Sequence, residues 1–275
     1  MREFRIFGNV AFRETVRMSN TDLVAFTGQG IAVWALVAAV FTLAGTVKGV
    51  IGLGLPTLSM ALLAVWMPPA AAAALLIVPS LATNVWQLQP WATLRRITQR
   101  LGGMQSGIVA GTLVGAWCFG APAGAGATVA LGLSLICYAA WGLLARPLTL
   151  AAQHERWLGP LAGFLTGVIT AVTGVFVLPA VVYLQSLALS RDELIQAMGL
   201  SFTTSTIALG FALAGQDSYS TPLLGASLVM LVPAIAGMAL GQWVRLRLPV
   251  AVFKRCFFAG LALLGVYMVL REILR

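Results

Sequence analysis

Charged residues are scarce in this chain, and acidic residues are absent from its long apolar stretches. Only 9% of its 275 residues are charged and 60% are hydrophobic, whereas soluble domains carry roughly 25% charged residues. Between residues 31 and 94 the one charged residue is Lys48, and between residues 101 and 145 there is none. This composition excludes an ordinary soluble domain and indicates a series of transmembrane helices.

The sequence also has little of what membrane enzymes and pumps need. Its 8 acidic residues all fall in predicted tails, loops or helix ends, and its 1 histidine, His154, lies in a polar stretch. Proton-coupled carriers use carboxylates or histidines inside the membrane, and this sequence places none there. Paired aspartates, a serine–histidine dyad, a nucleotide-binding motif and metal-ligand spacing of the 3 cysteines are all missing. We therefore expect a protein that is not an enzyme and uses no cofactor or metal.

The net charge of +9 does not indicate a nucleic-acid partner. The basic residues cluster between apolar stretches, as they do on the cytoplasmic face of a membrane protein. The clusters are Arg95, Arg96 and Arg100; Arg146 and Arg156; and Arg245, Arg247, Lys254 and Arg255. The expected partner is the lipid bilayer of the cell inner membrane, which the chain crosses several times.

Hydropathy and helix-breaking residues predict an all-α polytopic fold with ten helical pieces, of which eight are confident spans. The second and seventh pieces are too short to cross about 30 Å of hydrocarbon. The predicted pieces are 31–47, 55–67, 70–88, 103–120, 125–145, 158–173, 176–188, 194–213, 221–243 and 252–270. We divide the chain into a basic tail (1–27), a first transmembrane repeat (28–145), a cytoplasmic connecting loop (146–157) and a second transmembrane repeat (158–275).

A glycine-rich interruption occurs once in each half. The first break reads G-T-V-K-G-V-I-G-L-G-L-P, from Gly45 to Pro56, and the second reads G-V-I-T-A-V-T-G-V-F-V-L-P, from Gly167 to Pro179. Glycine and proline at this density open a helix. Open backbone inside a membrane is tolerated only where protein buries it or where it lines a polar cavity. Matching interruptions in two halves indicate the central binding site of a carrier.

Each half is thus a broken helical hairpin followed by three spans. If the second hairpin returns to the side on which it began, all three basic clusters lie on one side. If it crosses, the cluster at 245–255 lies outside, against the distribution of positive charge in membrane proteins. A returning hairpin with three spans gives an odd number of crossings, so we predict an inverted repeat. The side of the N-terminal tail stays open, because this topology places its arginines outside.

Lys48 is the cation in the first break, and two interpretations of it are open. Its ammonium extends to the membrane interface, or it faces a central cavity and attracts an anion together with nearby half-helix N-termini. The glycines expected to open the backbone at the substrate are Gly49, Gly52, Gly54 and Gly174. The expected hydrogen-bond donors are Asn84, Thr170, Thr173 and Ser201. Buried hydroxyls and amides also serve simply to join helices.

The two breaks resemble the motifs of the sulfite exporter TauE/SafE family. G49-V-I-G-L-G-L-P56 resembles the first glycine-rich motif, and T173-G-V-F-V-L-P-A-V-V-Y-L184 resembles the second, which is typically T-G-V-G-G-P-P with a tyrosine soon after. The resemblance covers roughly residues 31–271. This chain departs from it with Phe176-Val177 in place of the double glycine and with Leu178 in place of one proline. The resemblance implies transport of small sulfur-containing anions such as sulfite, thiosulfate or organosulfonates.

The sequence predicts a secondary transporter that binds a small sulfur-containing anion near the membrane midplane, between the two broken hairpins. One alternative is a carrier for another small carboxylate or for a neutral metabolite. A second alternative is a non-transporting membrane scaffold whose basic tail recruits a partner. Glycine-opened helices favour a carrier, because a scaffold has no use for such costly breaks.

Overall fold

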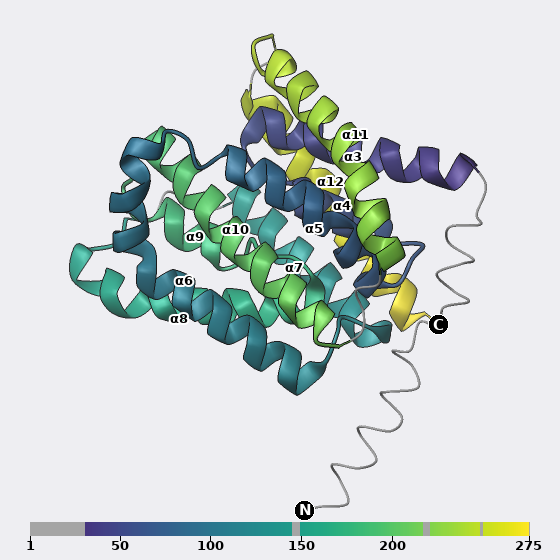
Figure 1. Ribbon diagram of the computed structural model, residues 1–275, viewed down its shortest axis with the longest axis horizontal. Coiled ribbons are helices and arrows are strands. Elements are labelled where there is room, and N and C mark those ends of the chain that lie inside the picture. The colour runs from purple at the N-terminus through teal and green to yellow at the C-terminus, as the bar shows by residue number, and fades with distance from the viewer. Residues whose placement is uncertain (1–30, 145–148, 217–220, 248–249, 275) are drawn as a thin grey trace, which may run out of the picture.

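The computed structural model describes residues 31–144, 149–216, 221–247 and 250–274, and all regular structure in these ranges is helical. The predicted all-α fold is therefore confirmed. Figure 1 shows α6 and α8 side by side, with α3 and α11 packed together elsewhere in the bundle. The ten helices in these ranges are α3 (Ile31–Ile51), α4 (Leu55–Leu63), α5 (Pro69–Trp86), α6 (Trp91–Phe119), α7 (Gly124–Leu144), α8 (Ala152–Thr173), α9 (Ala180–Gln185), α10 (Arg191–Ala214), α11 (Thr221–Arg245) and α12 (Val250–Ile273).

Six of the described helices are long and apolar enough to cross a membrane: α3, α5, α7, α10, α11 and α12. Helices α6 and α8 are not among them, because each begins with a polar stretch. Helix α6 begins at Trp91 rather than at residue 103, and α8 begins at Ala152 rather than at residue 158. Arginine, glutamine and glutamate are good helix formers, so helix continues where apolar character ends. Two segments predicted as loops are therefore partly helical.

Both predicted breaks interrupt helices, although the edges differ from the prediction. Helix α3 continues to Ile51 rather than ending at residue 47, and the chain then turns through Gly52 (φ 78°) and Gly54 (φ 110°). Lys48 therefore lies in the last turn of α3 and not in the break itself. The second break turns at Gly174 (φ 70°), and α9 covers only Ala180–Gln185 of the predicted piece 176–188. Positive φ favours glycine, because a Cβ would be too close to the backbone.

Glycines bring α3 and α11 into backbone contact. A Cβ at Gly45 would overlap the Ala234 carbonyl oxygen, and a Cβ at Gly237 would overlap the Thr42 carbonyl oxygen. Contacts advance in the same direction along both helices, so the pair is parallel. Gly49 belongs to this crossing, since its Cβ would lie 2.9 Å from the backbone nitrogen of Gln242. It is helical and does not open the backbone, contrary to the prediction.

A matching crossing joins α6 and α8. A Cβ at Gly167 would overlap the Ile108 carbonyl oxygen, and a Cβ at Gly111 would overlap the Phe164 carbonyl oxygen. Here too the helices are parallel. The contacting residues on each helix are three positions apart, as they are in the α3–α11 pair. The two crossings therefore correspond residue for residue.

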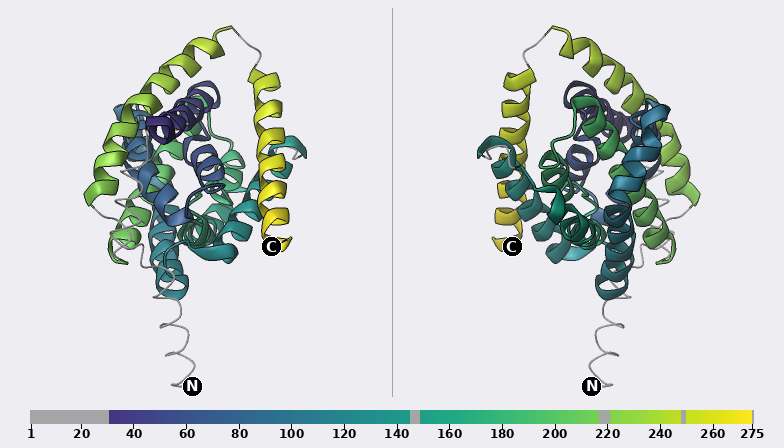
Figure 2. Two further views of the ribbon diagram at one scale, coloured as in Figure 1. Left: turned by 90° about the vertical axis from the view of Figure 1, so that its right-hand side faces the viewer. Right: turned by 90° about the vertical axis from the view of Figure 1, so that its left-hand side faces the viewer.

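Helices α7 and α12 cross in the opposite sense. A Cβ at Gly132 would lie 2.9 Å from the Gly265 carbonyl oxygen, and a Cβ at Gly265 would lie 2.6 Å from the Gly132 carbonyl oxygen. Gly132 also faces Met268, whereas Gly142, later in α7, faces the ring of Phe258, earlier in α12. The pair is therefore antiparallel. Figure 2 shows α12 diverging from α11, with α3 between them.

Candidate functional site

A buried polar cluster forms where the end of α3 meets α5. The Lys48 side chain is only 2% exposed. Its Nζ donates to Thr83 Oγ1 at 3.1 Å and to Asn84 Oδ1. Asn84 Nδ2 in turn donates to Ser80 Oγ at 3.2 Å and to Thr206 Oγ1 of α10 at 3.4 Å. The ammonium is thus held inside the bundle and does not reach the surface.

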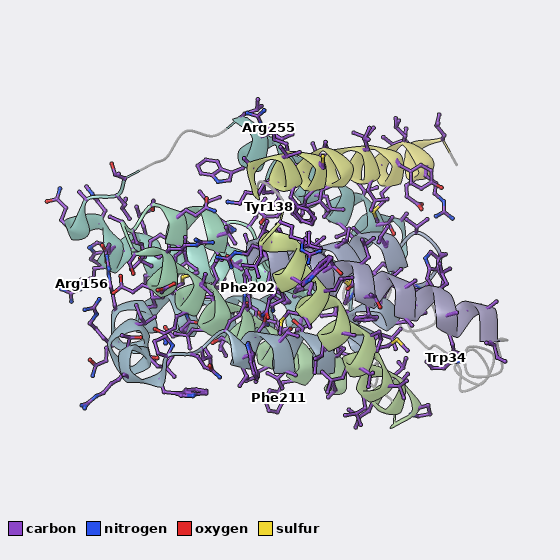
Figure 3. All side chains as sticks on the ribbon, turned by 90° about the horizontal axis from the view of Figure 1, so that it is seen from above. Trp34, Tyr138, Arg156, Phe202, Phe211 and Arg255 are labelled. Carbon is purple, nitrogen blue, oxygen red and sulfur yellow. The ribbon has the colours of Figure 1, made fainter. Side chains whose placement is uncertain are left out.

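Helices α5 and α10 form the centre around this cluster. Ile77 lies beside Gly210, and Gln87 lies beside Gly199, so the two helices are antiparallel. Phe202 of α10 is 1% exposed and lies near the middle of the bundle in Figure 3. Thr206, which accepts from Asn84, lies one turn after Phe202 on α10.

No carboxylate in the described ranges pairs with Lys48. The two ion pairs found there are Arg96–Glu193 and Arg100–Glu155, and both involve exposed arginines of α6. Burying an ammonium without a counter-ion is unfavourable by several kcal/mol. The hydroxyl of Thr83 and the amide oxygen of Asn84 are neutral and compensate only part of this penalty. The cluster therefore suits a ligand that brings negative charge.

Gln87 links the first break to this cluster. Its Nε2 donates to the carbonyl oxygen of Gly52 at 2.8 Å. A Cβ at Gly52 would lie 3.7 Å from the same Nε2 atom. The polar end of α5 thus holds the opened backbone beside Asn84 and Lys48. The sequence places Gln87 in the predicted piece 70–88, and in the structure it caps the C-terminus of α5, but nothing in the sequence indicates its contact with Gly52.

The polar side chains of the second break are satisfied locally. Thr170 Oγ1 donates to the Thr166 carbonyl oxygen at 2.7 Å, and Thr173 Oγ1 donates to that of Ile169 at 2.7 Å. Thr173 Oγ1 also accepts from the backbone nitrogen of Val175 at 3.1 Å. None of these contacts reaches the Lys48 cluster.

The remaining predicted site residues have other neighbours. A Cβ at Gly174 would lie 3.1 Å from Met60 Sδ of α4, so the second break approaches the first hairpin. Gly54 packs against Val47 and Phe257. Ser201 accepts from Gln105 Nε2 of α6 at 3.0 Å and is separate from the Lys48 cluster.

Two hydroxyls that the sequence reasoning missed lie in α4, directly after the first break. Thr57 and Ser59 are both 0% exposed, and neither side-chain oxygen has a hydrogen-bond partner in the described part of the protein. Thr57 is in the first turn of α4, whose N-cap, Gly54, provides no side-chain cap. Thr57 shares a helix face with Met60, which contacts Gly174. Their position immediately after Pro56 is the one signal in the sequence that could have identified them.

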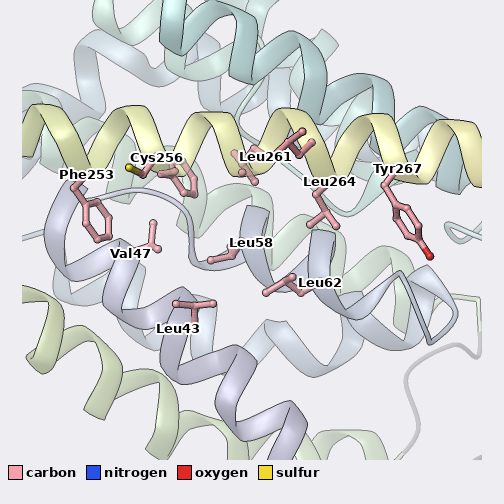
Figure 4. A pocket seen from close by; sticks show the side chains of 12 residues that line it. Leu43, Val47, Leu58, Leu62, Phe253, Cys256, Leu261, Leu264 and Tyr267 are labelled. Atoms are coloured by element: carbon pink, nitrogen blue, oxygen red, sulfur yellow. The ribbon is translucent and has the colours of Figure 1, made fainter.

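A separate groove lies between α12 and the α3–α4 hairpin (Figure 4). Its volume is about 510 Å³. Its walls include Leu43, Leu58, Phe253 and Leu264, and almost all of its lining is apolar. It offers no charged or amide group to an anion, so it is not the candidate anion site.

Both breaks lie within a region that matches a known protein family. The family model described as Sulfite exporter TauE/SafE matches residues 37–268, which is most of the chain. The chain belongs to this family. The TauE/SafE family consists of membrane transporters of sulfur-containing anions, and the apolar helices agree with a multi-pass membrane protein. Neither the curated proteins nor the solved structures yield a match.

In this TauE/SafE protein, a residue that differs from the typical second motif changes the packing beside the second break. Phe176, which stands where the motif typically has glycine, is 0% exposed. Its ring centroid lies 5.4 Å from that of Phe202. An aromatic ring therefore fills space that glycines would leave open beside the second break.

Proposed function

We propose that this TauE/SafE protein is a secondary transporter that moves a small sulfur-containing anion, such as sulfite, thiosulfate or an organosulfonate, across the inner membrane. The observation that carries the proposal is the buried ammonium of Lys48, which contacts only neutral oxygens. A bound oxyanion supplies the missing negative charge. Charge-assisted hydrogen bonds are roughly twice as strong as neutral ones, so Lys48 is the main determinant of anion binding in this proposal.

Two further residues complete the proposed cradle. Asn84 donates from Nδ2 to Ser80 Oγ and Thr206 Oγ1, which orients its Oδ1 toward Lys48. We assign to the cradle also the unpartnered hydroxyl of Thr57, in the first turn of α4. The N-terminus of a helix carries partial positive charge and suits an anion. Gly52 and Gly54 keep the backbone open beside these groups. We assign Gly49 to close packing of the helices around the site.

The second break forms the opposite wall of the proposed site. Gly174 approaches Met60 of α4, which supports a site between the two hairpins. Thr170 and Thr173 hold this wall in shape through their hydrogen bonds to the backbone. Ser201, together with Gln105, provides polar groups beside the anion's route rather than in the cradle.

We further propose that the two halves form an inverted repeat. In both glycine crossings, the first helix of one half packs against the fourth helix of the other half: α3 against α11, and α8 against α6. An inverted repeat predicts this reciprocal packing. The third and fifth helices of each half pair with their own counterparts, α5 with α10 and α7 with α12, and both pairs are antiparallel. Antiparallel counterparts support halves of opposite orientation.

In the proposed topology each half has three crossing helices and a hairpin (α3–α4 or α8–α9) that enters the membrane and returns to the same side, so the chain has eight long apolar segments. Six are the long apolar helices already described, and the other two are the apolar parts of α6 and α8 that follow their polar first turns. The polar start of α6 carries the exposed arginines of the Arg96–Glu193 and Arg100–Glu155 pairs, and the polar start of α8 carries Glu155. We place them on the cytoplasmic side, where basic residues concentrate.

Uptake measurements in proteoliposomes test this function. The wild-type protein is assayed with sulfite, thiosulfate, a small organosulfonate, a carboxylate of similar size and a neutral metabolite. We expect flux of one of the sulfur-containing anions and a loss of binding by about tenfold to a hundredfold in Lys48→Met, because a hydrogen bond to a charged group contributes roughly 1.5–3 kcal/mol.

Lys254→Met is the matched control, because Lys254 is exposed on α12. It should retain wild-type flux. Normal anion binding by Lys48→Met would refute the cradle, and flux of the carboxylate or neutral solute alone would refute the substrate class.

A further inference from the structure

The apolar groove beside α12 has the dimensions of a lipid chain. Helix α12 lines it from Phe253 to Tyr267, a length of about 21 Å at 1.5 Å per residue. One leaflet contributes roughly half of the ~30 Å hydrocarbon core. The groove is therefore long enough to hold an acyl chain through the depth of one leaflet.

Gly260 keeps the groove open midway along α12. It is exposed, and a Cβ placed on it would have no atom within 4 Å. Its neighbours along the groove, Leu264 and Phe257, are large apolar residues. The absence of a side chain at this one position leaves room for a chain to lie against the helix.

A fixed cation marks one end of the groove. Arg271 lies one turn beyond Tyr267, on the same face of α12, and its Nη1 donates to the carbonyl oxygen of Val65, in the turn between α4 and α5. That contact uses one of the five N–H donors of a guanidinium. Glu272 follows in the sequence but lies about a quarter of a turn away around the helix.

We propose that the groove binds one acyl chain of an anionic phospholipid whose phosphate contacts Arg271 and the Tyr267 hydroxyl. A guanidinium suits a phosphate because it can donate two parallel hydrogen bonds. The occupant is a lipid rather than a polar solute because the lining is almost entirely apolar along its length. This site is separate from the proposed anion cradle and does not depend on transport.

The bound chain contacts the first hairpin directly. Leu43 and Val47 of α3 and Leu58 and Leu62 of α4 form the wall opposite α12 (Figure 4). Val47 also packs against Gly54 in the first break. A lipid in the groove therefore stabilises the position of the hairpin that carries Lys48.

Native mass spectrometry of the purified full-length protein tests the site, with phosphatidylglycerol and phosphatidylcholine of identical chains as probes. We expect one phosphatidylglycerol to be retained at least tenfold more strongly than phosphatidylcholine. Gly260→Leu fills the groove and should abolish this retention. Gly225→Leu is the matched control, because Gly225 of α11 is also exposed with open space around it, and it should retain the lipid.

The headgroup contact is tested separately. Arg271→Gln should remove the preference for phosphatidylglycerol, and Arg271→Lys should keep part of it. Tyr267→Phe checks the same contact without disturbing the bond to Val65. Equal retention of both lipids by the wild type would overturn the proposal, and so would unchanged retention by Gly260→Leu. Loss of a dimer in Gly260→Leu without loss of lipid would also overturn it, because a second copy of the chain would then be the occupant of the groove.

Discussion

The two breaks begin from closely similar sequences and hold their polar groups in opposite ways. Directly before the first break, Lys48 at the end of α3 reaches across to α5. Directly after it, Thr57 of α4 is buried without a partner in the described residues. In the second, Thr170 and Thr173 bond to the backbone of their own helix. The first hairpin therefore has binding capacity to offer a ligand, whereas the second has used its capacity to stabilise itself.

The apolar residues at the two breaks also differ, because a bulky side chain is buried beside the second break where the first has a glycine. Gly54 of the first break stands close to Val47 and Phe257, while the second break fills the corresponding region with Phe176, which packs on Phe202. An aromatic pair of this kind contributes roughly 0.5–1.5 kcal/mol beyond burial. If the two halves arose by duplication, as the proposed inverted repeat implies, one hairpin kept the binding chemistry and the other became part of the core.

The largest effect should come from closing the first break. In Gly52→Leu we expect transport to be abolished while membrane insertion and yield are retained. Gly52 has φ 78°, where a side chain is unfavourable by roughly 1–2 kcal/mol, and the leucine would occupy the space beside Gln87. Flux in proteoliposomes is the measurement. Gly102→Leu, at a glycine with no atom within 4 Å of its Cβ position, is the control, and full flux in Gly52→Leu would contradict the prediction.

The next effect concerns net charge. Lys48 is the one charged residue between residues 31 and 94, and the second break has Thr170 at the equivalent position. With no acidic relay in these segments, we expect the anion to carry its own charge across. A potential of 100 mV corresponds to about 2.3 kcal/mol per charge, or roughly a fiftyfold gradient at equilibrium. Vesicles with a potassium–valinomycin potential measure this, and flux that ignores the imposed voltage would exclude electrogenic transport.

A smaller and more selective effect is expected at Thr57. Thr57→Val removes a hydroxyl that has no partner in the described structure, so stability should stay the same or rise, because an unsatisfied buried polar group is unfavourable by about 1–3 kcal/mol. Anion binding should weaken by about tenfold. Thermal unfolding and binding are measured on the same preparation. Wild-type binding would remove Thr57 from the cradle.

The smallest effect on binding is expected from the matching change in the second break. Thr173→Val removes the acceptor of the Val175 N–H, so the protein should lose about 1 kcal/mol of stability. Anion affinity should change by less than threefold. If Thr173→Val instead weakened anion binding as much as Thr57→Val, the two breaks would contribute equally to anion binding.

Much of the fold could be predicted from the sequence, because lipid imposes a strong pattern on helices. Ten helical pieces were expected, and ten helices lie in the described ranges. Their ends were less accurate where polar residues continue a helix, as at the starts of α6 and α8. Hydropathy reports where lipid or core surrounds a residue, and it does not report where the backbone stops being helical.

The site was harder to predict, because glycine serves two purposes that look the same in a sequence. Gly52 and Gly174 are needed for positive φ, whereas Gly49 and Gly167 are needed for close approach of another helix. Both purposes require only the absence of a Cβ. The neighbours of Lys48 depend on how α3 meets α5, and no periodicity in either segment indicates that meeting.

The reciprocal contact of Gly132 and Gly265 carries an evolutionary implication. Each glycine stands over the carbonyl of the other, at the crossing of α7 with its antiparallel counterpart α12. If a homodimer preceded the fused chain, this point lay on its twofold axis, where a single residue touched its own copy. In such a dimer, any substitution at this position would have changed both subunits at once, so only symmetric changes could have been selected. Under the proposed inverted repeat, fusion freed the two positions to change independently, yet both are glycine in this chain.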